Sequence, residues 1–291
     1  GGGAPLEFAV PGAGVVLQLA GGPASAGPGR ERAVVFVHGS WHAAWCWDVH
    51  FLDYFRARGF DAYALSLRGH GGSGQGGVED GTVEMHAGDV AAFVEHVHRE
   101  SGRPVVLVGH SFGGLFVQSA ASRLVAAGSA ALAGAVLLSS VPPSGNAELG
   151  KRYFQRDFVL GARLTWAMVT RAFERDLELS RLMFFGQGMP LEQVGRYTDR
   201  MGEGCPPGAR LLDLRRLSGS LPVEAVPPGK LPVMVAGGDA DVIVDREALE
   251  ETARAHGVEA VILEGVAHDA MLDLKWEDTA NAIADWIERK T

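Results

Sequence analysis

Two hydrophobic patterns follow one another along this chain, and together they predict a parallel sheet wrapped by helices. Short continuous apolar runs are typical of strands buried on both faces. They occur at 33–37, 60–65, 105–108, 134–138, 231–236 and 260–263. Segments between several of these runs repeat apolar residues at helical spacing, as after Thr82, which is placed to cap a helix. Alternation of this kind indicates an α/β fold with a mostly parallel central sheet.

The two ends of the chain complete this picture. Apolar runs at 6–10 and 15–20 are separated by Pro11-Gly12-Ala13-Gly14, which predicts a β-hairpin at the edge of the sheet. The last segment places Trp276, Ile283 and Ile287 on one helical face. We therefore expect a closing helix that packs on the sheet.

The alternation stops near Val141-Pro142-Pro143 and resumes after Pro227-Pro228-Gly229. Between these points the apolar residues recur at helical spacing, and Arg and aromatic residues are frequent. No segment there has the pattern of a strand. We interpret residues 1–291 as one domain whose core covers 1–143 and 229–291, with an inserted helical cap at 144–228. The apolar residues of the cap have two possible roles. The simpler is packing on the core, and the more specific is to line a lipophilic pocket.

Composition narrows the possible partners. A chain of 291 residues with 47% hydrophobic residues can bury a full core. The net charge of -9 disfavours nucleic acid and anionic membrane as partners. No apolar run is long enough to span a bilayer. Cys46 and Cys205 lie far apart without metal spacing, so the sequence predicts neither a disulfide framework nor a zinc site.

These features lead us to expect a soluble, intracellular protein, in the cytoplasm or inside an organelle. The chain begins with Gly1-Gly2-Gly3 and shows no charged-then-apolar leader. We therefore expect that any targeting segment was removed or was never present.

The candidate chemistry centres on Gly109-His110-Ser111-Phe112-Gly113, between an apolar strand and a helical pattern. This is a G-x-S-x-G nucleophile elbow. A serine at the tip of a strand-to-helix turn holds strained backbone angles, and glycines two residues on either side allow the close packing that such a turn requires. The first amides of the new helix then point at the serine, where they can stabilise an anion. Ser111 is the predicted nucleophile.

A serine nucleophile needs a base, and the base needs an acid that orients it. In the fold implied by the elbow, the order along the chain is serine, acid, histidine. Asp239 and Asp241 follow one late strand, and His268 follows the next. Carboxyl ends of parallel strands are where such sheets bind ligands. Asp245 is better placed to cap the helix that begins at Arg246.

The chain resembles an α/β-hydrolase of the branch that includes plant methylesterases, hydroxynitrile lyases and bacterial carboxylesterases. The motifs that carry the resemblance are the elbow and three segments: His38-Gly39-Ser40-Trp41-His42-Ala43-Ala44-Trp45-Cys46-Trp47, Gly238-Asp239-Ala240-Asp241 and Ala267-His268-Asp269-Ala270-Met271-Leu272-Asp273. These motifs extend the resemblance from about residue 33 to the C-terminus. The resemblance is weakest in the cap.

The resemblance assigns roles to several residues. It favours Asp241 over Asp239 as the acid, because the family pattern has it at the last position of the Gly-acid-x-Asp run. It implies structural hydrogen bonds for His38 and His42 and a supporting role for His110 behind the elbow. The oxyanion hole is expected from the backbone N–H groups of Ser40 and Phe112.

Substrate-lining candidates are Trp41, which adjoins Ser40, and three aromatic residues of the cap, namely Phe158, Trp166 and Phe184. We predict no metal and no cofactor. His96 and His98 lie two apart on a helix and do not share a face, so they make a poor metal pair. The expected partner is a small-molecule ester.

The leading hypothesis is a serine carboxylesterase whose ester has a lipophilic or aromatic part. The candidates run from methyl esters of small acids to prenyl or phytyl esters. The alternatives are a cofactor-free lyase, haloperoxidase or C–C hydrolase on the same fold, or a small-molecule receptor. Cyanohydrin lyases of this branch have a lysine after the catalytic histidine, and this chain has Asp269 there. Related enzymes with an aspartate nucleophile are disfavoured by Ser111.

Overall fold

Residues 6–26, 29–75, 81–206, 209–212 and 217–291 are described by the structure, a computed structural model. The triglycine start of the chain and small parts of the expected core and cap lie outside these residues. Within them, eight strands form one sheet in the order β1-β2-β4-β3-β5-β6-β7-β8. The strands are β1 (Leu6–Val10), β2 (Val15–Gly22), β3 (Ala33–Val37), β4 (Asp61–Leu65), β5 (Val105–His110), β6 (Leu132–Leu138), β7 (Val233–Gly238) and β8 (Ala260–Leu263).

The strand directions confirm the predicted α/β class. β1 pairs with β2 and β2 with β4 in antiparallel fashion, whereas every pair from β4 to β8 is parallel. The predicted hairpin is present at the edge. β7 begins at Val233, two residues later than predicted, because Pro232 has no N–H to donate to a strand ladder.

Helices cover both faces of the sheet. They are α1 (Trp45–Asp48), α2 (Phe51–Ala57), α3 (Val83–Ser101), α4 (Phe112–Ala126), α10 (Arg246–Ala255) and α11 (Trp276–Lys290). Thr82 caps α3 as predicted, because its side chain accepts a hydrogen bond from the N–H of Met85. The segment after β3 forms two short helices, α1 and α2, because His50 between them leaves the helical conformation with φ −140°.

The continuous apolar runs reflect burial on both sides of the sheet. Every residue of β3 is buried. Val35 and Val37 pack in the hydrophobic cluster that contains residues of α3 and α4, whereas Val34 and Phe36 pack in the cluster that contains residues of α1, α2 and α11. Successive side chains of a strand point to opposite faces, so a strand covered on both faces needs apolar residues at every position.

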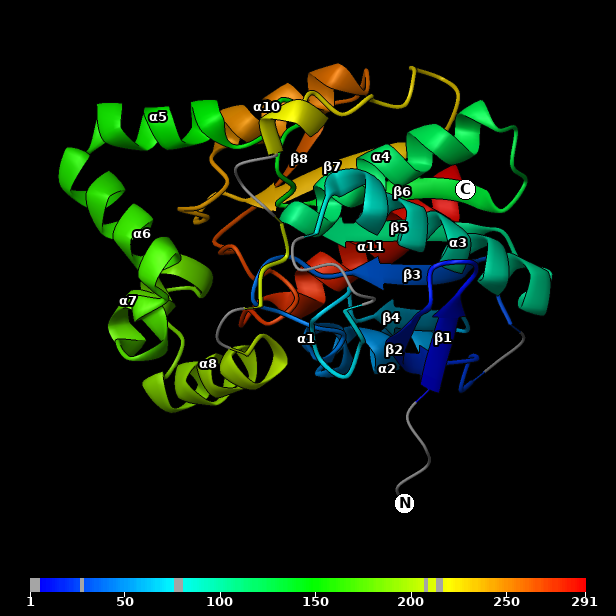
Figure 1. Ribbon diagram of the computed structural model, residues 1–291, viewed down its shortest axis with the longest axis horizontal. Coiled ribbons are helices and arrows are strands. Elements are labelled where there is room, and N and C mark those ends of the chain that lie inside the picture. Colours follow the sequence, from blue (N-terminus) through cyan, green and yellow to red (C-terminus); the bar gives the residue numbers. More distant parts are fainter. Residues whose placement is uncertain (1–5, 27–28, 76–80, 207–208, 213–216) are drawn as a thin grey trace.

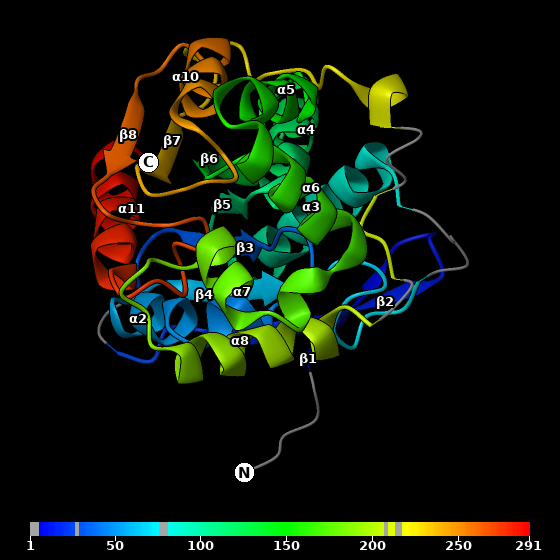
Figure 2. The ribbon, with the colours of Figure 1, turned by 90° about the vertical axis from the view of Figure 1, so that its left-hand side faces the viewer.

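The expected cap segment lies between β6 and β7. Its helices are α5 (Ala147–Arg156), α6 (Phe158–Thr170), α7 (Leu177–Phe184) and α8 (Leu191–Gly204), with short 3₁₀ turns η1 (Ala172–Glu174) and η2 (Ser218–Ser220). The part of this segment that the structure describes contains no strand. Figures 1 and 2 show α5–α8 at the end of the molecule toward which the parallel strands point. The cap therefore faces the sheet edge where the candidate residues lie.

Candidate active site

The elbow brings β5 directly into α4 through Ser111, which has φ 54° and ψ −123°. A positive φ is unfavourable for a residue with a side chain and costs on the order of 1–3 kcal/mol. The flanking glycines make the turn possible. A Cβ on Gly109 would lie 2.7 Å from the carbonyl oxygen of Gly113, and one on Gly113 would lie 2.6 Å from the carbonyl oxygen of Val37. The glycine spacing in the motif is thus a steric requirement.

Neighbouring strands hold the strained serine in place. The N–H of Ser111 donates to the carbonyl oxygen of Leu138 at 3.2 Å, and its own carbonyl oxygen accepts from the N–H of Val141 at 3.1 Å. Leu138 is the last residue of β6, and Val141 lies three residues after it. Ser111 itself is 7% exposed, so its environment is the protein interior and the adjoining cavity.

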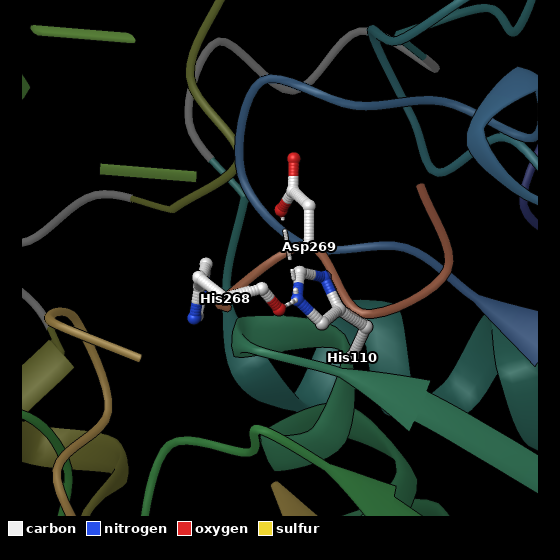
Figure 3. Close-up of side chains that lie close together, drawn as sticks. All are labelled: His110, His268 and Asp269. Atoms are coloured by element: carbon white, nitrogen blue, oxygen red, sulfur yellow. Dashed lines mark hydrogen bonds and ion pairs between the residues drawn. The ribbon is translucent and has the colours of Figure 1, made fainter. Parts of the chain in front are cut away.

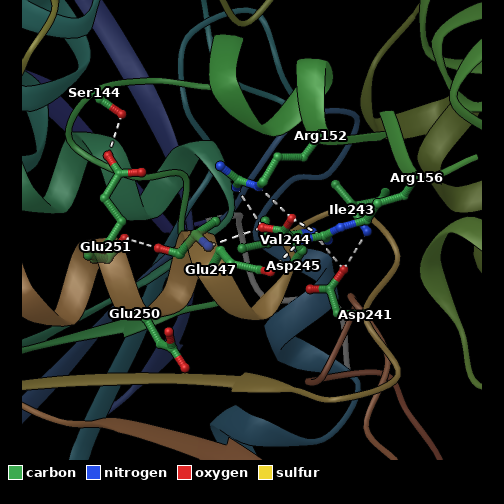
Figure 4. A network of polar contacts seen from close by, with 12 residues as sticks. Ser144, Arg152, Arg156, Asp241, Ile243, Val244, Asp245, Glu247, Glu250 and Glu251 are labelled. Carbon is green, nitrogen blue, oxygen red and sulfur yellow. Dashed lines mark hydrogen bonds and ion pairs between the residues drawn. The ribbon is translucent and has the colours of Figure 1, made fainter. Parts of the chain in front are cut away.

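Asp241 and His268 come together from the ends of two neighbouring strands. Nδ1 of His268 lies 2.8 Å from Oδ2 of Asp241. The other carboxylate oxygen, Oδ1, accepts the N–H groups of Ile243 at 2.7 Å and Val244 at 2.9 Å, as Figure 4 shows. Both oxygens of the buried carboxylate therefore accept hydrogen bonds. The bond to Nδ1 fixes the imidazole, and its Nε2 takes no part in the contact with Asp241.

The two competing carboxylates have other partners. Asp239 accepts the N–H of Gly265 at 2.6 Å and has an exposed side chain. Asp245 accepts the N–H of Ala248 at 3.0 Å and caps α10, as predicted. The geometry thus places Asp241 at the position that the family pattern implies for the acid.

Two opposing effects act on the pKa of His268. Burial disfavours the imidazolium and lowers the pKa, whereas the charge and hydrogen bond of Asp241 and the charge of Asp269 raise it. The carboxylates prevail, so the pKa of His268 lies above its ordinary value of 6.5. An imidazole in this setting accepts a proton readily, which is what a general base requires.

Ser111 and His268 line the same cavity. No hydrogen bond between their side chains is found among the described residues. Such contacts are often long in ligand-free enzymes and shorten when a substrate binds.

The backbone around Ser40 approaches the serine closely. A Cβ on Gly39 would lie 2.8 Å from the Cβ of Ser111, so only glycine lets the loop after β3 come this near. The N–H of Ser40 donates no hydrogen bond among those described. The same is true of the N–H of Phe112, which as the first residue of α4 has no acceptor within its helix. Both amides are available for an oxyanion.

A cavity of about 240 Å³ adjoins these groups. Most of its lining is apolar. The lining residues are Ser40, Trp41, His42, His110, Ser111, Phe112, Val141, Asn146, Leu149, Gly150, Tyr153, Leu164, Thr165, Met168, Val169, Phe184, Ile243, Val244, His268 and Asp269. Enclosed apolar surface beside a few convergent polar groups is typical of a small-molecule site.

Two of the four predicted substrate-lining residues face this cavity. Trp41 and Phe184 line it, and their rings lie 5.9 Å apart. Phe158 and Trp166 do not line it, contrary to the prediction. These two residues are 71% and 55% exposed, because α6 turns other residues toward the cavity.

The histidines near the serine are structural, in line with the roles that the resemblance implies. Nδ1 of His38 lies 2.8 Å from the carbonyl oxygen of Gly39, and its Nε2 accepts the N–H of Leu67 at 2.9 Å. Nε2 of His110 donates to the carbonyl oxygen of His268 at 2.9 Å. Burial lowers the pKa of His110 to about 3, helped by the proximity of His268, so His110 supports the loop of His268 as a neutral ring.

No motif in the sequence assigns a role to Asp269, although the structure buries it completely beside His268. Figure 3 shows it next to His110. Together with His268 these residues bring three potential metal-ligating atoms within 4.8 Å of one another. However, Nδ1 of His268 is bound to Asp241 and Nε2 of His110 to a carbonyl oxygen. Hydrogen bonds within the protein therefore explain why these three residues lie close together.

A comparison with protein families identifies the chain. The model of the family described as "Alpha/beta hydrolase family" matches residues 34–282. The chain belongs to the alpha/beta hydrolase family. The matched range includes the elbow, Asp241 and His268, and it spans the cap segment. None of the described helices of this alpha/beta hydrolase is long and apolar enough to cross a membrane.

Curated relatives include two kinds of methylesterase, which agrees with the resemblance seen in the sequence. Protein phosphatase methylesterase 1 of Mus musculus is 30% identical over 176 residues, which cover 57% of this chain and 44% of that protein. Methyl jasmonate esterase 1 of Vitis vinifera is 34% identical over 94 residues, or 32% of this chain and 35% of that protein. The matches thus span less than half the length of these relatives.

Solved structures share the fold over nearly the whole chain. An esterase from Rhodococcus sp. ECU1013 has a TM-score of 0.65 at 23% identity, with 95% of each chain covered. A bromoperoxidase from Bacillus anthracis has a TM-score of 0.70 at 17% identity, with coverage of 98% of this chain and 100% of that one. At these identities the likeness establishes the fold alone.

Proposed function

We propose that this alpha/beta hydrolase is a serine carboxylesterase that hydrolyses an ester with a lipophilic or aromatic part. The observation that carries the proposal is the meeting of Ser111, on its strained elbow, and the Asp241–His268 pair at one apolar cavity. The methylesterase relatives support an ester as the bond that is cleaved. The apolar lining supports a lipophilic group.

In the proposed mechanism, the Ser111 hydroxyl attacks the acyl carbon while Nε2 of His268 takes its proton. Asp241 keeps the imidazole in the orientation that exposes Nε2 and stabilises the imidazolium that forms. The amides of Ser40 and Phe112 bind the negative oxygen of the tetrahedral intermediate. His268 then protonates the departing alcohol, and an acyl-enzyme remains on Ser111.

Water completes the cycle through the same groups. His268 removes a proton from the water, which attacks the acyl carbon, and the second tetrahedral intermediate uses the same two amides. Collapse of this intermediate returns the proton to Ser111 and releases the acid. The residues of this chain supply every proton transfer in the scheme.

The proposal is tested with p-nitrophenyl esters of increasing acyl length, assayed on the parent protein and on Ser111→Ala. We expect turnover by the parent with a preference for longer or aromatic acyl groups. The variant should lose about three to six orders of magnitude in kcat, since removing a nucleophile leaves only binding and oxyanion stabilisation. Parent-like turnover in Ser111→Ala would exclude Ser111 as the nucleophile.

Further assays on the parent address the alternative activities. Cyanohydrin cleavage would indicate a lyase, and bromination in the presence of bromide, hydrogen peroxide and a carboxylic acid would indicate a haloperoxidase. Cleavage of a carbon–carbon bond in a diketone would indicate a C–C hydrolase. Failure to turn over any ester, together with tight binding of a small molecule, would support a receptor instead.

A further inference from the structure

Asp269 is a buried carboxylate that the proposed reaction does not use. It has no exposed surface. Its Oδ2 lies 2.9 Å from Nε2 of His42, and its backbone N–H donates to the carbonyl oxygen of Phe184 at 2.9 Å. Asp269 therefore contacts the oxyanion loop through His42 and the cap through Phe184. Since it also follows His268 directly, it joins three parts of the site.

His42 faces an oxygen acceptor at each ring nitrogen. Nδ1 lies 2.8 Å from the carbonyl oxygen of Ser40, and Nε2 lies 2.9 Å from Asp269. A carbonyl oxygen has no proton to donate, and neither has an ionised carboxylate. Two hydrogen bonds of this kind need two N–H groups, and an imidazole ring carries two only as the imidazolium.

The surroundings of Asp269 favour its ionised form. Burial raises the pKa of this carboxyl, but its neighbours, His42 above all, more than offset that effect and lower it below the ordinary value. Nε2 of His110 lies 3.8 Å from Oδ1. An ionised carboxylate in a fully buried position requires a compensating positive charge.

The other titratable groups around the pair supply little of that charge. Burial lowers the pKa values of His38 and His70, and it lowers that of His110 to about 3, so these rings are neutral at neutral pH. Burial raises the pKa of the Cys46 thiol, which is therefore uncharged as well. The Arg200 guanidinium lies over the Trp45 ring, which in turn stacks on His42 at 5.5 Å. Besides His268, His42 is thus the titratable group best placed to balance Asp269.

We propose that His42 is an imidazolium held by Asp269, and that this buried ion pair positions the oxyanion loop relative to His268. The hydrogen bond from Nδ1 of His42 fixes the carbonyl of Ser40, directly before Trp41, whose backbone has the unfavourable φ of 62°. A bulky residue stays in this conformation only where its surroundings hold it. His42 is therefore a positioning residue for the Ser40 amide.

The charge state of His42 is tested on the resting protein by NMR of ¹⁵N-labelled histidines, from neutral to mildly alkaline pH. We expect two protonated ring nitrogens for His42, assigned by its loss in His42→Gln or, should that variant not fold, by its ring contact with Trp45. In Asp269→Asn the ring should carry a single proton. His86, which is buried with Nε2 on the carbonyl oxygen of Leu211, is the neutral reference. A single proton on His42 of the parent would overturn the proposal.

The positioning role is tested by kinetics and rests on the proposed esterase function. Asp269→Asn and His42→Gln should each lower kcat/KM about ten- to hundredfold, mainly through kcat, because a displaced oxyanion donor loses part of its hundred- to thousandfold contribution. The kcat/KM of the double variant should be no lower than that of the less active single variant, since both substitutions remove the same interaction. Fully additive losses would contradict the role.

A matched control separates this effect from general damage to the core. His86→Gln removes another buried histidine that bonds a carbonyl oxygen, at a position that does not line the cavity. It should leave kcat/KM within about twofold of the parent, as expected for a change without a role in the transition state. Should the parent hydrolyse no ester, the esterase proposal fails, whereas the NMR experiment still decides the charge of His42.

Discussion

At the scale of single residues, the surroundings of two neighbouring aspartates separate their roles. Asp241 is 8% exposed, bonds His268 and accepts two backbone amides, whereas Asp239 has an exposed side chain and accepts the amide of Gly265. A carboxylate acts as the acid of a triad only where it can orient the imidazole. The hydrogen bond at 2.8 Å meets that condition for Asp241.

Exchange of each carboxylate for an amide tests this distinction. Asp241→Asn should reduce kcat by about a thousand- to ten-thousandfold, because the amide favours the wrong tautomer of His268. Asp239→Asn, the matched control two residues away, should stay within about threefold of the parent, since it is a surface change away from the reacting groups. Steady-state rates on the best p-nitrophenyl ester provide the measurement, and the reverse order of effects would assign the acid to Asp239.

The raised pKa of His268 predicts the pH dependence. The base must be neutral to accept the serine proton, so kcat/KM should fall as the pH is lowered through the pKa of His268. Because Asp241 and Asp269 raise this pKa above 6.5 against the effect of burial, the midpoint of the acid limb should lie above that value. A profile of kcat/KM against pH checks this. An acid limb centred well below 6.5 would show that burial prevails over the two carboxylates.

At the scale of elements, the elbow depends on close contact between α4 and the loop after β3. A Cβ on Gly113 would overlap the carbonyl oxygens of Val37 and His38, which belong to the backbone and cannot turn away. Gly113→Ala should therefore reduce the free energy of unfolding by about 3 kcal/mol, near the upper end for overpacking, and abolish esterase activity.

A second glycine provides the control for that substitution. Gly88 lies in α3, where an added Cβ would come no nearer than 3.9 Å, to the Arg123 guanidinium. Gly88→Ala should raise the free energy of unfolding by about 0.5–1 kcal/mol, because alanine loses less backbone entropy in a helix. Urea unfolding of both variants gives the two values. Equal effects would contradict the steric account of the elbow.

Helix α6 turns one side to the cavity and another to solvent. Leu164, Thr165 and Met168 line the cavity, whereas Phe158 and Trp166 are exposed. Met168→Ala should enlarge the cavity and shift the ratio of kcat/KM for long over short acyl chains by about tenfold, since one or two methylene groups are worth this much in an apolar pocket. Trp166→Ala should leave the chain-length profile unchanged. A similar shift in both variants would show that the cavity does not hold the acyl chain.

At the scale of the whole molecule, an ionic cluster ties the cap to the core (Figure 4). Arg152 of α5 bonds both carboxylate oxygens of Asp245 at 2.7 Å, and Arg156 joins one of them at 2.9 Å. Asp245 also caps α10 and directly follows Val244, whose N–H bonds Asp241. The ion pairs between cap and core thus involve Asp245, the residue directly after Val244, whose N–H holds the proposed catalytic acid.

Removal of the Arg152 fork should loosen this tie. The side chains of Arg152 and Asp245 are 20% and 10% exposed. A hydrogen bond to a charged group contributes about 1.5–3 kcal/mol to the free energy of unfolding. Arg152→Gln should therefore lower the Tm by several degrees and raise KM, because α5 lines the cavity. The control is Lys151→Gln on the same helix, whose pair with Glu148 is 61% and 63% exposed and should contribute little. Thermal unfolding and KM for both variants check the prediction, and equal shifts would count against it.

Much of the fold and the core of the candidate site could be predicted because their signals are local. A strand covered on both faces shows a continuous apolar run, and the steric needs of an elbow appear as glycines two residues on either side of Ser111. The hairpin and the capping of α3 by Thr82 follow from similarly short stretches, and the order of serine, acid and histidine follows from the fold that the elbow implies. The sequence by itself therefore determined the fold class and the candidates Ser111 and His268.

Other features depend on residues that only the tertiary structure brings together. His42 and Asp269 are 227 positions apart, and neither belongs to a local pattern that predicts the other. The sequence indicated a helical, aromatic-rich cap but not which side of each helix meets the cavity, so Phe158 and Trp166 were placed incorrectly in it. The direction of a helix face and the partner of a buried charge are set by packing between distant segments. For that reason the cavity and the His42–Asp269 pair appear only in the folded protein.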